Sequence, residues 1–450
     1  MKSLNTRGHR SAGRILALSA FLFAWPMGAK AQWAVIYLNP SKASSSVATG
    51  VADGQQVGRA TVGGIGRASL WRGSAGTWVD LQPAEWASSV ASGVGGGQQV
   101  GYVIDGAGVH HASLWTGSAG SWVDLHPAGA GHSLATGVDG GLQVGYVVDV
   151  IDGVNVFRAG LWYGTAGTWV NLHPNWATES RAMGVGGGHV AGFVVDDAGV
   201  LHASLWTDTA GSWVWVDLHP AVEGVSLSSA HDVGGDQVVG YAKVDGYFHA
   251  GLWNRTADSW VWVDLHPPGV NESSGVLAVD GGEQVGIVYN NDPYHAALWR
   301  GTPDSYVDLH AFLSRDFEDS LASGIWHDAK YTYVVGYGYN TKRQRQEALM
   351  WRAEYSTPAP PAETGAIEGR VFAPNGSAVK GALVTATDPA GNQWETTSAG
   401  KQGSYTLTEL PAGVYTVEGI KDGVGYAVLD GVQVIAGETT SGVDLHLLPY

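Results

Sequence analysis

Short runs of alternating apolar and polar residues fill most of the chain, and turns rich in glycine separate them. Residues 111–127 read HASLWTGSAGSWVDLHP, and closely similar segments recur at 202–220 and 249–267. Alternation with a period of two over four to eight residues is typical of half-buried β-strands, and DG, GG and AGS sequences suit hairpin turns. The pattern therefore predicts an all-β chain of repeated antiparallel hairpins.

Each repeat contains four strand-like segments, and the third carries a tryptophan that recurs every 44 to 52 residues. The third-segment tryptophans are Trp71, Trp115, Trp162, Trp206, Trp253, Trp299 and Trp351. The fourth segment, WVDLHP or a close variant, is read from Trp78, Trp122, Trp169, Trp213, Trp260 and Tyr306. No such segment follows Trp351, so the last repeat lacks its outer strand.

A seventh copy of the fourth segment lies at the opposite end of the array, as WAVIYLNP at residues 33–40. A ring in which the two chain ends share one sheet is a β-propeller, and ring closure also protects the sheet edges. We therefore predict a seven-bladed β-propeller of four-stranded blades at residues 32–355, with the N-terminal strand closing the last blade. An open β-solenoid is the alternative.

The composition agrees with closely packed blades, because the chain holds 20 Trp and 66 Gly while only 14% of its residues are charged. A buried aromatic ring removes about 150–250 Å² from water, so we expect the repeated tryptophans to be structural. The chain has no cysteine. Stability must then come from packing, and thiol catalysis and cysteine-ligated zinc are excluded.

Residues 1–31 are predicted to be a signal peptide. Four basic residues precede the apolar run ILALSAFLFAWPMGA, and the small-residue sequence AKA ends at residue 31. The run is shorter than the roughly 20 residues that span a bilayer, so a membrane anchor is the weaker reading. Cleavage would remove five basic and no acidic residues and change the formal net charge from −17 to −22. We expect a secreted, acidic protein that neither binds nucleic acid nor inserts into a membrane.

Histidine and aspartate also recur at fixed places in the repeat, as in HASLW and VDLHP. Equivalent positions in neighbouring blades lie too far apart to share a metal ion, whose bonds to nitrogen are about 2.0–2.1 Å long. We therefore expect inter-strand hydrogen bonds from these residues, and no metal or cofactor. The units resemble HAF-type extracellular repeats, with HASLW, HAGLW and HAALW in place of HAFLW. This resemblance implies a secreted repeat protein and brings no catalytic residues.

The repeat ends at a Pro/Ala-rich linker, residues 356–365, which we expect to be stiff and extended. Alternating runs in residues 366–450 predict a β-sandwich. The segment GSYTLTELPAGVYTV, residues 403–417, resembles the signature of carboxypeptidase regulatory-like domains, which share a prealbumin-like fold with starch-binding and Cna B-type modules. The resemblance implies an accessory domain without peptidase activity. Its first strand has no lysine, so we expect no Lys–Asn crosslink.

A functional site is expected where the sevenfold pattern is broken. Trp86 and Trp176 stand in connections between blades and could stack on a sugar ring, or cap a blade edge. First-strand irregularities near the axis provide the remaining candidates. These candidates are Arg181, the pair His231 and Asp232, and the segment Trp326, His327 and Asp328. Adjacent residues of a strand point to opposite faces, so neither His–Asp pair is expected to act as a simple dyad.

The sequence therefore predicts a secreted, monomeric, non-catalytic binding or scaffold protein whose partner is a glycan or a cell-surface component. The candidate ligand-binding residues are Trp86, Trp176, Arg181, His231, Asp232, Trp326 and His327. A propeller-type polysaccharide lyase or glycoside hydrolase is the first alternative, with catalytic residues among Arg181, His231, Asp232, His327 and Asp328. A purely structural surface or matrix protein is the second.

Overall fold

The computed structural model describes residues 33–151, 153–209, 211–256, 259–289, 293–355, 364–389, 392–411, 413–435 and 439–449. The predicted signal peptide and residues 356–363 of the predicted linker lie outside these residues, whereas Thr364 and Gly365, also assigned to the linker, begin strand β29 (Thr364–Phe372). The chain divides into two compact units, residues 1–355 and 356–450. Within the described residues, no helix is both long and apolar enough to cross a membrane.

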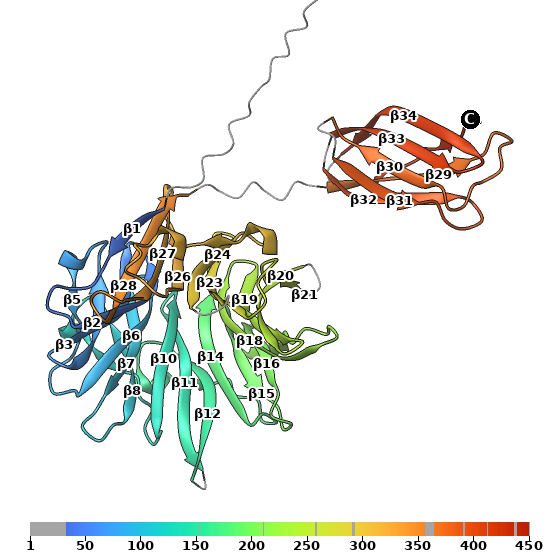
Figure 1. Ribbon diagram of the computed structural model, residues 1–450. Helices are drawn as coiled ribbons and strands as arrows, with labels where there is room; N and C mark the ends of the chain where they lie inside the picture. The colour runs from blue at the N-terminus through green and yellow to red at the C-terminus, as the bar shows by residue number, and fades with distance from the viewer. Residues whose placement is uncertain are drawn as a thin grey trace, which may run out of the picture. The chain divides into compact units, whose positions relative to one another are not determined.

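The first unit consists of seven four-stranded antiparallel sheets arranged as the blades of a propeller (Figure 1). In each blade the innermost strand comes first and the next two strands follow outward through tight turns. Blades 1 to 3 are β2–β5 (Ser45–Ala52, Gln55–Val62, Ile65–Trp71, Val79–Asp80), β6–β9 (Ser88–Gly95, Gln98–Ile104, His110–Trp115, Val123–Asp124) and β10–β13 (His132–Asp139, Leu142–Ile151, Val154–Trp162, Val170–Asn171). Blades 4 to 6 are β14–β17 (Glu179–Gly186, His189–Val195, Leu201–Asp208, Trp213–Asp217), β18–β21 (Val225–Gly234, Gln237–Val244, Tyr247–Arg255, Trp260–Asp264) and β22–β25 (Ser274–Asp280, Glu283–Tyr289, Tyr294–Trp299, Val307–Asp308).

Blade 7 combines the two ends of the repeat array. It contains β26 (Leu321–His327), β27 (Tyr331–Asn340) and β28 (Arg345–Glu354), and its outer strand is β1 (Ala34–Tyr37). The register places Val35 opposite Trp351, and the N–H of Leu38 donates to the carbonyl of Ala348 at 2.9 Å. The prediction of a closed, seven-bladed propeller is confirmed, and the solenoid alternative is wrong. Short 3₁₀ helices lie beside some outer strands, at Ala75–Thr77, Ala119–Ser121, Ala166–Thr168, Pro303–Ser305 and His310–Phe312.

The third-strand tryptophans form the centre of the packing between blades. All seven are between 0 and 1% exposed, and each belongs to an apolar cluster that joins two adjacent blades. Their indole N–H groups are not equivalent, however. Trp206 donates to the carbonyl of Leu172 at 2.9 Å, whereas the buried indole N–H of Trp162 has no acceptor in the described part of the chain.

The sequence-based alignment of the fourth strand is wrong in blades 4 and 5. The repeated tryptophans there are Trp215 and Trp262, not Trp213 and Trp260. The indole N–H of Trp215 donates to Ser204 Oγ at 3.0 Å, the same bond that the outer tryptophans of blades 1 and 2 make. The segment WVWVDL carries two tryptophans two residues apart, and strand alternation places both on one face. Sequence periodicity therefore could not choose between them.

Four blade junctions contain the same pair of closely packed imidazoles, stacked in three of them and tilted by 37° in the pair of His202 and His219. The first histidine places Nδ1 2.8–3.1 Å from a fourth-strand aspartate, and its ring centre lies 4.1–4.7 Å from that of the second histidine. Nδ1 of the second histidine lies 2.8–2.9 Å from a serine hydroxyl of the next blade. The pairs are His111 with His126, His202 with His219, His249 with His266, and His295 with His310. The predicted hydrogen-bonding role of the repeated histidines is confirmed.

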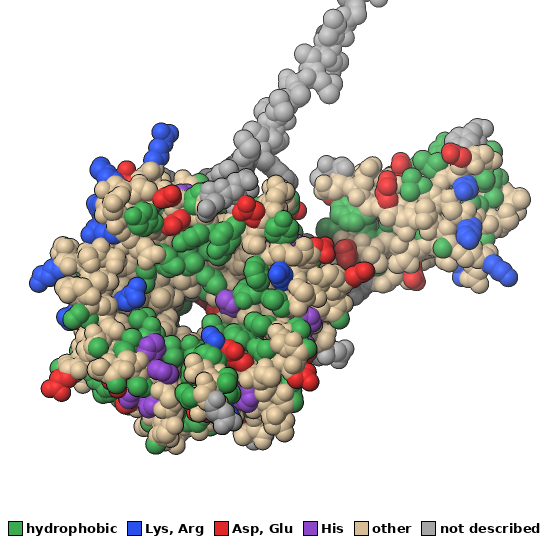
Figure 2. Space-filling view, turned by 60° about the horizontal axis from the view of Figure 1, so that its bottom comes forward, with side chains coloured by type: hydrophobic (Ala, Val, Ile, Leu, Met, Phe, Trp, Pro, Cys, Tyr) green, Lys and Arg blue, Asp and Glu red, His purple; other side chains and the backbone are tan. Residues whose placement is uncertain are grey.

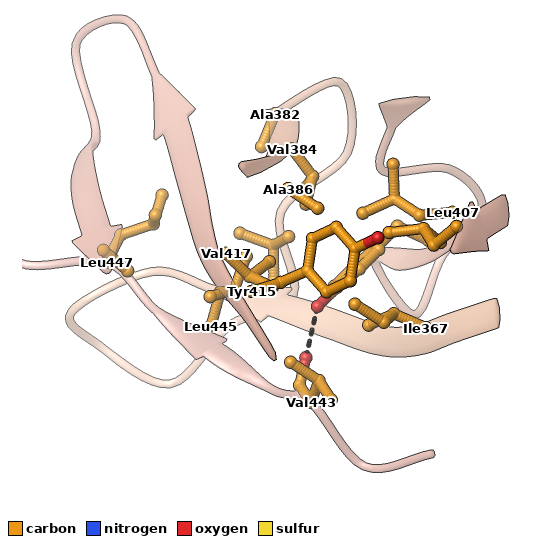
Figure 3. Packing of buried hydrophobic residues seen from close by; sticks show 14 of the residues in the cluster. Ile367, Ala382, Val384, Ala386, Leu407, Tyr415, Val417, Val443, Leu445 and Leu447 are labelled. Atoms are coloured by element: carbon orange, nitrogen blue, oxygen red, sulfur yellow. Dashed lines mark hydrogen bonds between the residues drawn. The ribbon is translucent and has the colours of Figure 1, made fainter. Parts of the chain in front are cut away.

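The second unit is a β-sandwich. One sheet contains β29 (Thr364–Phe372), β32 (Ser404–Pro411), β35 (Thr439–Thr440) and β36 (Leu445–His446), and the other contains β30 (Leu383–Thr387), β31 (Gln393–Thr397), β33 (Gly413–Lys421) and β34 (Gly425–Val434). Residues from both sheets, including Ile367, Val384 and Leu445, form the buried core in Figure 3. The hydroxyl of Tyr405 donates to the carbonyl of Val443 at 2.6 Å, shown as the dashed line in Figure 3.

The unequal indole hydrogen bonds give a first prediction. Trp206→Phe leaves the buried carbonyl of Leu172 without its donor, whereas Trp162→Phe removes an N–H group that has no acceptor. Both changes remove a similar apolar volume. We expect Trp206→Phe to lower the free energy of unfolding by about 1–3 kcal/mol more than Trp162→Phe does. Urea unfolding of the two variants measures the difference, and equal losses would contradict the assignment.

The stacked histidines give a second prediction. Burial, with a smaller contribution from the neighbouring imidazole, lowers the pKa of the second histidine in each pair (His126, His219, His266 and His310). Between the unfolded pKa of about 6.5 and these lower values, the unfolded chain binds more protons than the folded chain. We therefore expect the free energy of unfolding to decrease as the pH falls below about 6.5.

Urea unfolding monitored by tryptophan fluorescence at pH 5.0 and 7.5 tests this expectation. His266→Gln should reduce the difference between the two pH values, because one of the groups with a lowered pKa is removed. His446→Gln, in the second unit, is the matched control and should leave the difference unchanged. A pH difference that His266→Gln leaves unaltered would show that other groups cause it.

Candidate functional site

The innermost strands of all seven blades line a cavity of about 340 Å³ around the propeller axis. The cavity lies where each innermost strand ends and turns into the second strand. Figure 2 shows the central opening of the ring, with hydrophobic side chains around much of it. Because every blade contributes the same segment, differences between blades decide the chemistry of the cavity.

Every innermost strand carries a β-bulge at the same place, beside this cavity. In blades 1, 3 and 7 the bulged residue is Thr or Ser, and its hydroxyl donates to a backbone carbonyl of the next blade at 2.8–3.0 Å. Blades 4 to 6 replace the hydroxyl residue with Met, His and Leu. The bulged residues are Thr49, Ser92, Thr136, Met183, His231, Leu277 and Ser323.

Asp232 is the strongest departure from the sevenfold pattern. The residue after the bulge is Gly in five blades and Ala in one, whereas blade 5 has Asp at this position. A Cβ atom on Gly184 would lie 2.6 Å from Asp232 Oδ1, so the glycine of blade 4 leaves room for the carboxyl group. Asp232 accepts the N–H of Val233 at 2.9 Å and the N–H of Val279, in blade 6, at 3.1 Å.

The surroundings of Asp232 shift its ionisation towards neutral pH. Asp232 is half-buried, because one side of the residue borders the axial cavity while protein surrounds its carboxyl group on the other sides. Burial raises the pKa of Asp232 to about 7, although the two backbone hydrogen bonds oppose the shift. The preceding residue, His231, lies edge-on to Tyr241 at 5.1 Å, and burial lowers its pKa to about 4. At pH 7 His231 is therefore a neutral imidazole.

The bulge also changes the expected geometry of this pair. Adjacent strand residues were expected to point to opposite faces, yet His231 and Asp232 both border the axial cavity. A bulged residue interrupts the alternation, which is why the sequence pattern did not predict this. Asp139 and Asp280 border the same cavity. None of the described lining residues is lysine or arginine, so the cavity wall is acidic.

A buried ion cluster joins blades 6 and 7 beside this cavity. The imidazole of His327 lies between Asp280 and Glu283, with Nδ1 2.9 Å from Asp280 Oδ2 and Nε2 2.8 Å from Glu283 Oε2. Glu283 also pairs with Arg300 at 2.7 Å and accepts the hydroxyl of Thr332 at 2.9 Å. Burial opposes the charged form of His327, but the two carboxylates outweigh this effect and raise its pKa.

Of the other candidate residues, Trp326 also borders the axial cavity, whereas the two loop tryptophans lie elsewhere. Half-buried Trp86 packs against Trp122, with ring centres 5.0 Å apart, and Trp176 is 47% exposed and lies edge-on to Trp215. Both loop tryptophans therefore contact outer-strand tryptophans, away from His231 and Asp232. Arg181 is also separate from this cavity.

Arg181 lies earlier on its innermost strand than the bulge. Its guanidinium carbon is 4.0 Å from the ring centre of Phe157, and it pairs with Glu179 at 2.8 Å. In blade 7, Trp326 borders the axial cavity and packs against Tyr333, with ring centres 5.5 Å apart, whereas Asp328 accepts hydrogen bonds from the turn that follows it. The alternation expected there holds, because Trp326 packs towards blade 1 and His327 bonds to blade 6.

Sequence reasoning missed Asp280 and Glu283. Asp280 was read as part of a turn, but Glu283 gave a usable signal because the equivalent positions in blades 1, 2 and 5 are glutamine. A charge that replaces glutamine at a buried repeated position requires a partner nearby. Within the described residues, no group of three or more His, Asp or Glu residues is arranged to hold a metal ion.

The family model of the carboxypeptidase regulatory-like domain matches residues 366–448. No curated protein matches the chain. Among solved structures, a puromycin-hydrolysing peptidase of Mycobacterium tuberculosis aligns at 14% identity and a TM-score of 0.42, over 78% of this chain and 59% of that chain. A prolyl endopeptidase aligns at 12% identity and a TM-score of 0.47, over 84% of this chain and 54% of that chain.

The β-propeller domain of the Trilobed protease from Pyrococcus furiosus aligns at 9% identity and a TM-score of 0.43, over 70% of this chain and 100% of that chain. The chain spans less than two thirds of the length of the puromycin-hydrolysing and prolyl peptidases that it matches.

These comparisons correct two predictions made from the sequence. The chain was expected to be a non-catalytic, glycan-binding protein and not an enzyme, but the solved structures that it resembles come from peptidases. The glycan-binding and non-enzymatic predictions are therefore withdrawn. The two loop tryptophans, which were part of the basis for these predictions, pack against outer-strand tryptophans of the blades. The chain consists of a seven-bladed β-propeller followed by a carboxypeptidase regulatory-like domain.

Proposed function

We propose that the propeller binds a short peptide segment in its axial cavity and recognises a basic side chain of that segment. The observation that carries the proposal is the acidic wall, in which Asp139, Asp232 and Asp280 border a cavity without lysine or arginine among its described lining residues. A cationic group entering this cavity gains charge-assisted hydrogen bonds, whereas an anion would be repelled.

Two features favour a peptide over a larger or more compact cation. Each innermost strand is hydrogen-bonded to a neighbour on one side only, so its second edge faces the axis. Such an edge offers backbone N–H and C=O groups to an extended chain. The volume of about 340 Å³ is near the lower end of the roughly 300–1,000 Å³ of ligand pockets, and it suits a short segment.

The proposal predicts a pH dependence that Asp232 controls. Ac-Ala-Ala-Arg-amide keeps its positive charge at all relevant pH values, while Asp232 ionises as the pH rises through about 7. We expect its affinity to increase between pH 6 and pH 8, by up to about tenfold if only the ionised form of Asp232 binds the guanidinium, because the ionised fraction rises about tenfold over this range. Isothermal titration calorimetry with the full chain measures this change.

Matched control variants distinguish a direct contact between Asp232 and the peptide from the general attraction of a cationic peptide to an acidic protein. Asp232→Asn should weaken binding at pH 8 and abolish the pH dependence. Asp197→Asn removes the same charge from an exposed position outside the cavity and should have little effect. The uncharged peptide Ac-Ala-Ala-Gln-amide should bind much more weakly. Equal effects of the two Asp variants would contradict recognition in the cavity.

The same samples report whether the bound peptide is also cleaved. A carboxyl group that titrates near neutrality is suited to proton transfer at that pH. Mass spectrometry of the peptide after incubation detects hydrolysis, and Asp232→Asn shows whether this carboxyl group is required for it.

We also propose that the seven units are HAF-type extracellular repeats and that the chain is exported after loss of residues 1–31. The basic start, the short apolar run and the AKA sequence support export. Expression in a secreting bacterial host should yield a protein that begins at Gln32, as measured by intact mass. Ala31→Tyr places a bulky residue at the cleavage site and should leave the leader attached. An exported wild-type protein that keeps its leader would contradict cleavage.

A further inference from the structure

A second cavity, of about 250 Å³, lies between blade 2 and blade 3. Its lining includes His110 of blade 2 and His132, Leu134, Tyr146 and Phe157 of blade 3. It shares none of its lining residues with the axial cavity. The aromatic rings and small volume make its chemistry different from that of the acidic site.

The aromatic walls of this cavity are held in place by their own neighbours. On one side, His110 stacks on Tyr102, with ring centres 4.9 Å apart and planes inclined by only 8°. On the other side, Tyr146 and Phe157 lie 5.9 Å apart. The guanidinium carbon of Arg181 lies 4.0 Å from the ring centre of Phe157 and fixes that ring. The rings are therefore preorganised before any ligand arrives.

One polar group of the lining has a defined hydrogen-bonding role. Nδ1 of His132 accepts the backbone N–H of His110 at 3.1 Å, so a neutral His132 carries its proton on Nε2. That Nε2–H group has no acceptor within the described part of the chain. Burial and the nearby His132 lower the pKa of His110, which keeps its imidazole neutral and able to stack at pH 7.5.

From this geometry we propose that the cavity binds one planar aromatic ring that carries a hydrogen-bond acceptor, as a phenol does. The ring lies between the His110 and Phe157 sides, and the acceptor takes the Nε2–H of His132. The volume is slightly below the range of about 300 Å³ upwards that larger ligands need, which limits the occupant to a single ring. Aromatic pairs at such distances add to the stabilisation from burial alone.

Titration of the full chain with p-cresol and with toluene at pH 7.5 tests the proposal, with binding followed by ligand-observed NMR. p-Cresol should bind, and toluene, which lacks the acceptor, should bind several-fold more weakly. Leu134→Trp fills the cavity and should reduce p-cresol affinity by about tenfold or more. Phe157→Ala should also weaken binding, because it removes one aromatic wall.

Blade 5 offers a matched control, since Phe248 occupies the position equivalent to Phe157 and lies 5.1 Å from Tyr241. Phe248→Ala should leave p-cresol binding unchanged. Thermal unfolding of each variant checks that it is folded. The proposal is overturned if p-cresol fails to bind the wild type, if a folded Leu134→Trp variant binds it as well as the wild type, or if Phe157→Ala and Phe248→Ala weaken binding equally.

The ring can come from a free aromatic compound or from a tyrosine side chain. Competition between p-cresol and N-acetyltyrosine amide distinguishes the two sources. Efficient competition assigns the site to tyrosine side chains, and its absence assigns it to free phenolic compounds. The amide carries no positive charge, so its binding is independent of the acidic axial cavity.

Discussion

The propeller depends on the pairing of β1 with β28. Four residues near the N-terminal end of the repeat array form an antiparallel ladder with residues more than 300 positions later, and this ladder completes the seventh sheet. Without it, blade 7 would present an unpaired edge at β28. The chain would then be an open arc whose terminal strands invite association with other chains. At the axis, the wall of the cavity is closed by the innermost strands of blades 7 and 1, where the Ser323 hydroxyl donates to the carbonyl of Ala48.

Ring closure could be predicted from the sequence because it follows from the regular repeat of the strand segments. The recurring third-strand tryptophans count the blades, and the displaced copy at Trp33 shows how the last one is completed. Local ambiguity was harder to resolve. In WVWVDL either tryptophan satisfies the alternation, and only the hydrogen bond from Trp215 to Ser204 identifies the repeated one.

The candidate site was only partly predictable, because its properties arise between blades. His231 and Asp232 were identified as irregular, but the bulge that brings both to the cavity follows from pairing register and not from residue type. The space for the Asp232 carboxyl group exists because blade 4 has Gly184 at the facing position, 48 residues earlier in the chain. A single repeat contains none of this information. The aromatic cavity is likewise formed by more than one repeat, because His110 comes from one blade and Tyr146 from the next.

The bulged residues do not make the same hydrogen bonds to the next blade at every blade junction. In blades 1, 3 and 7 a hydroxyl group ties each blade to the next, but blades 4 to 6 lack this tie. Between blades 5 and 6 the connection is made instead by Asp232, whose carboxylate accepts the N–H of Val279. An ionised acceptor makes a stronger hydrogen bond than a neutral one. Protonation of Asp232 therefore weakens a hydrogen bond that joins blades 5 and 6, so the group that faces a ligand also helps to hold two neighbouring blades together.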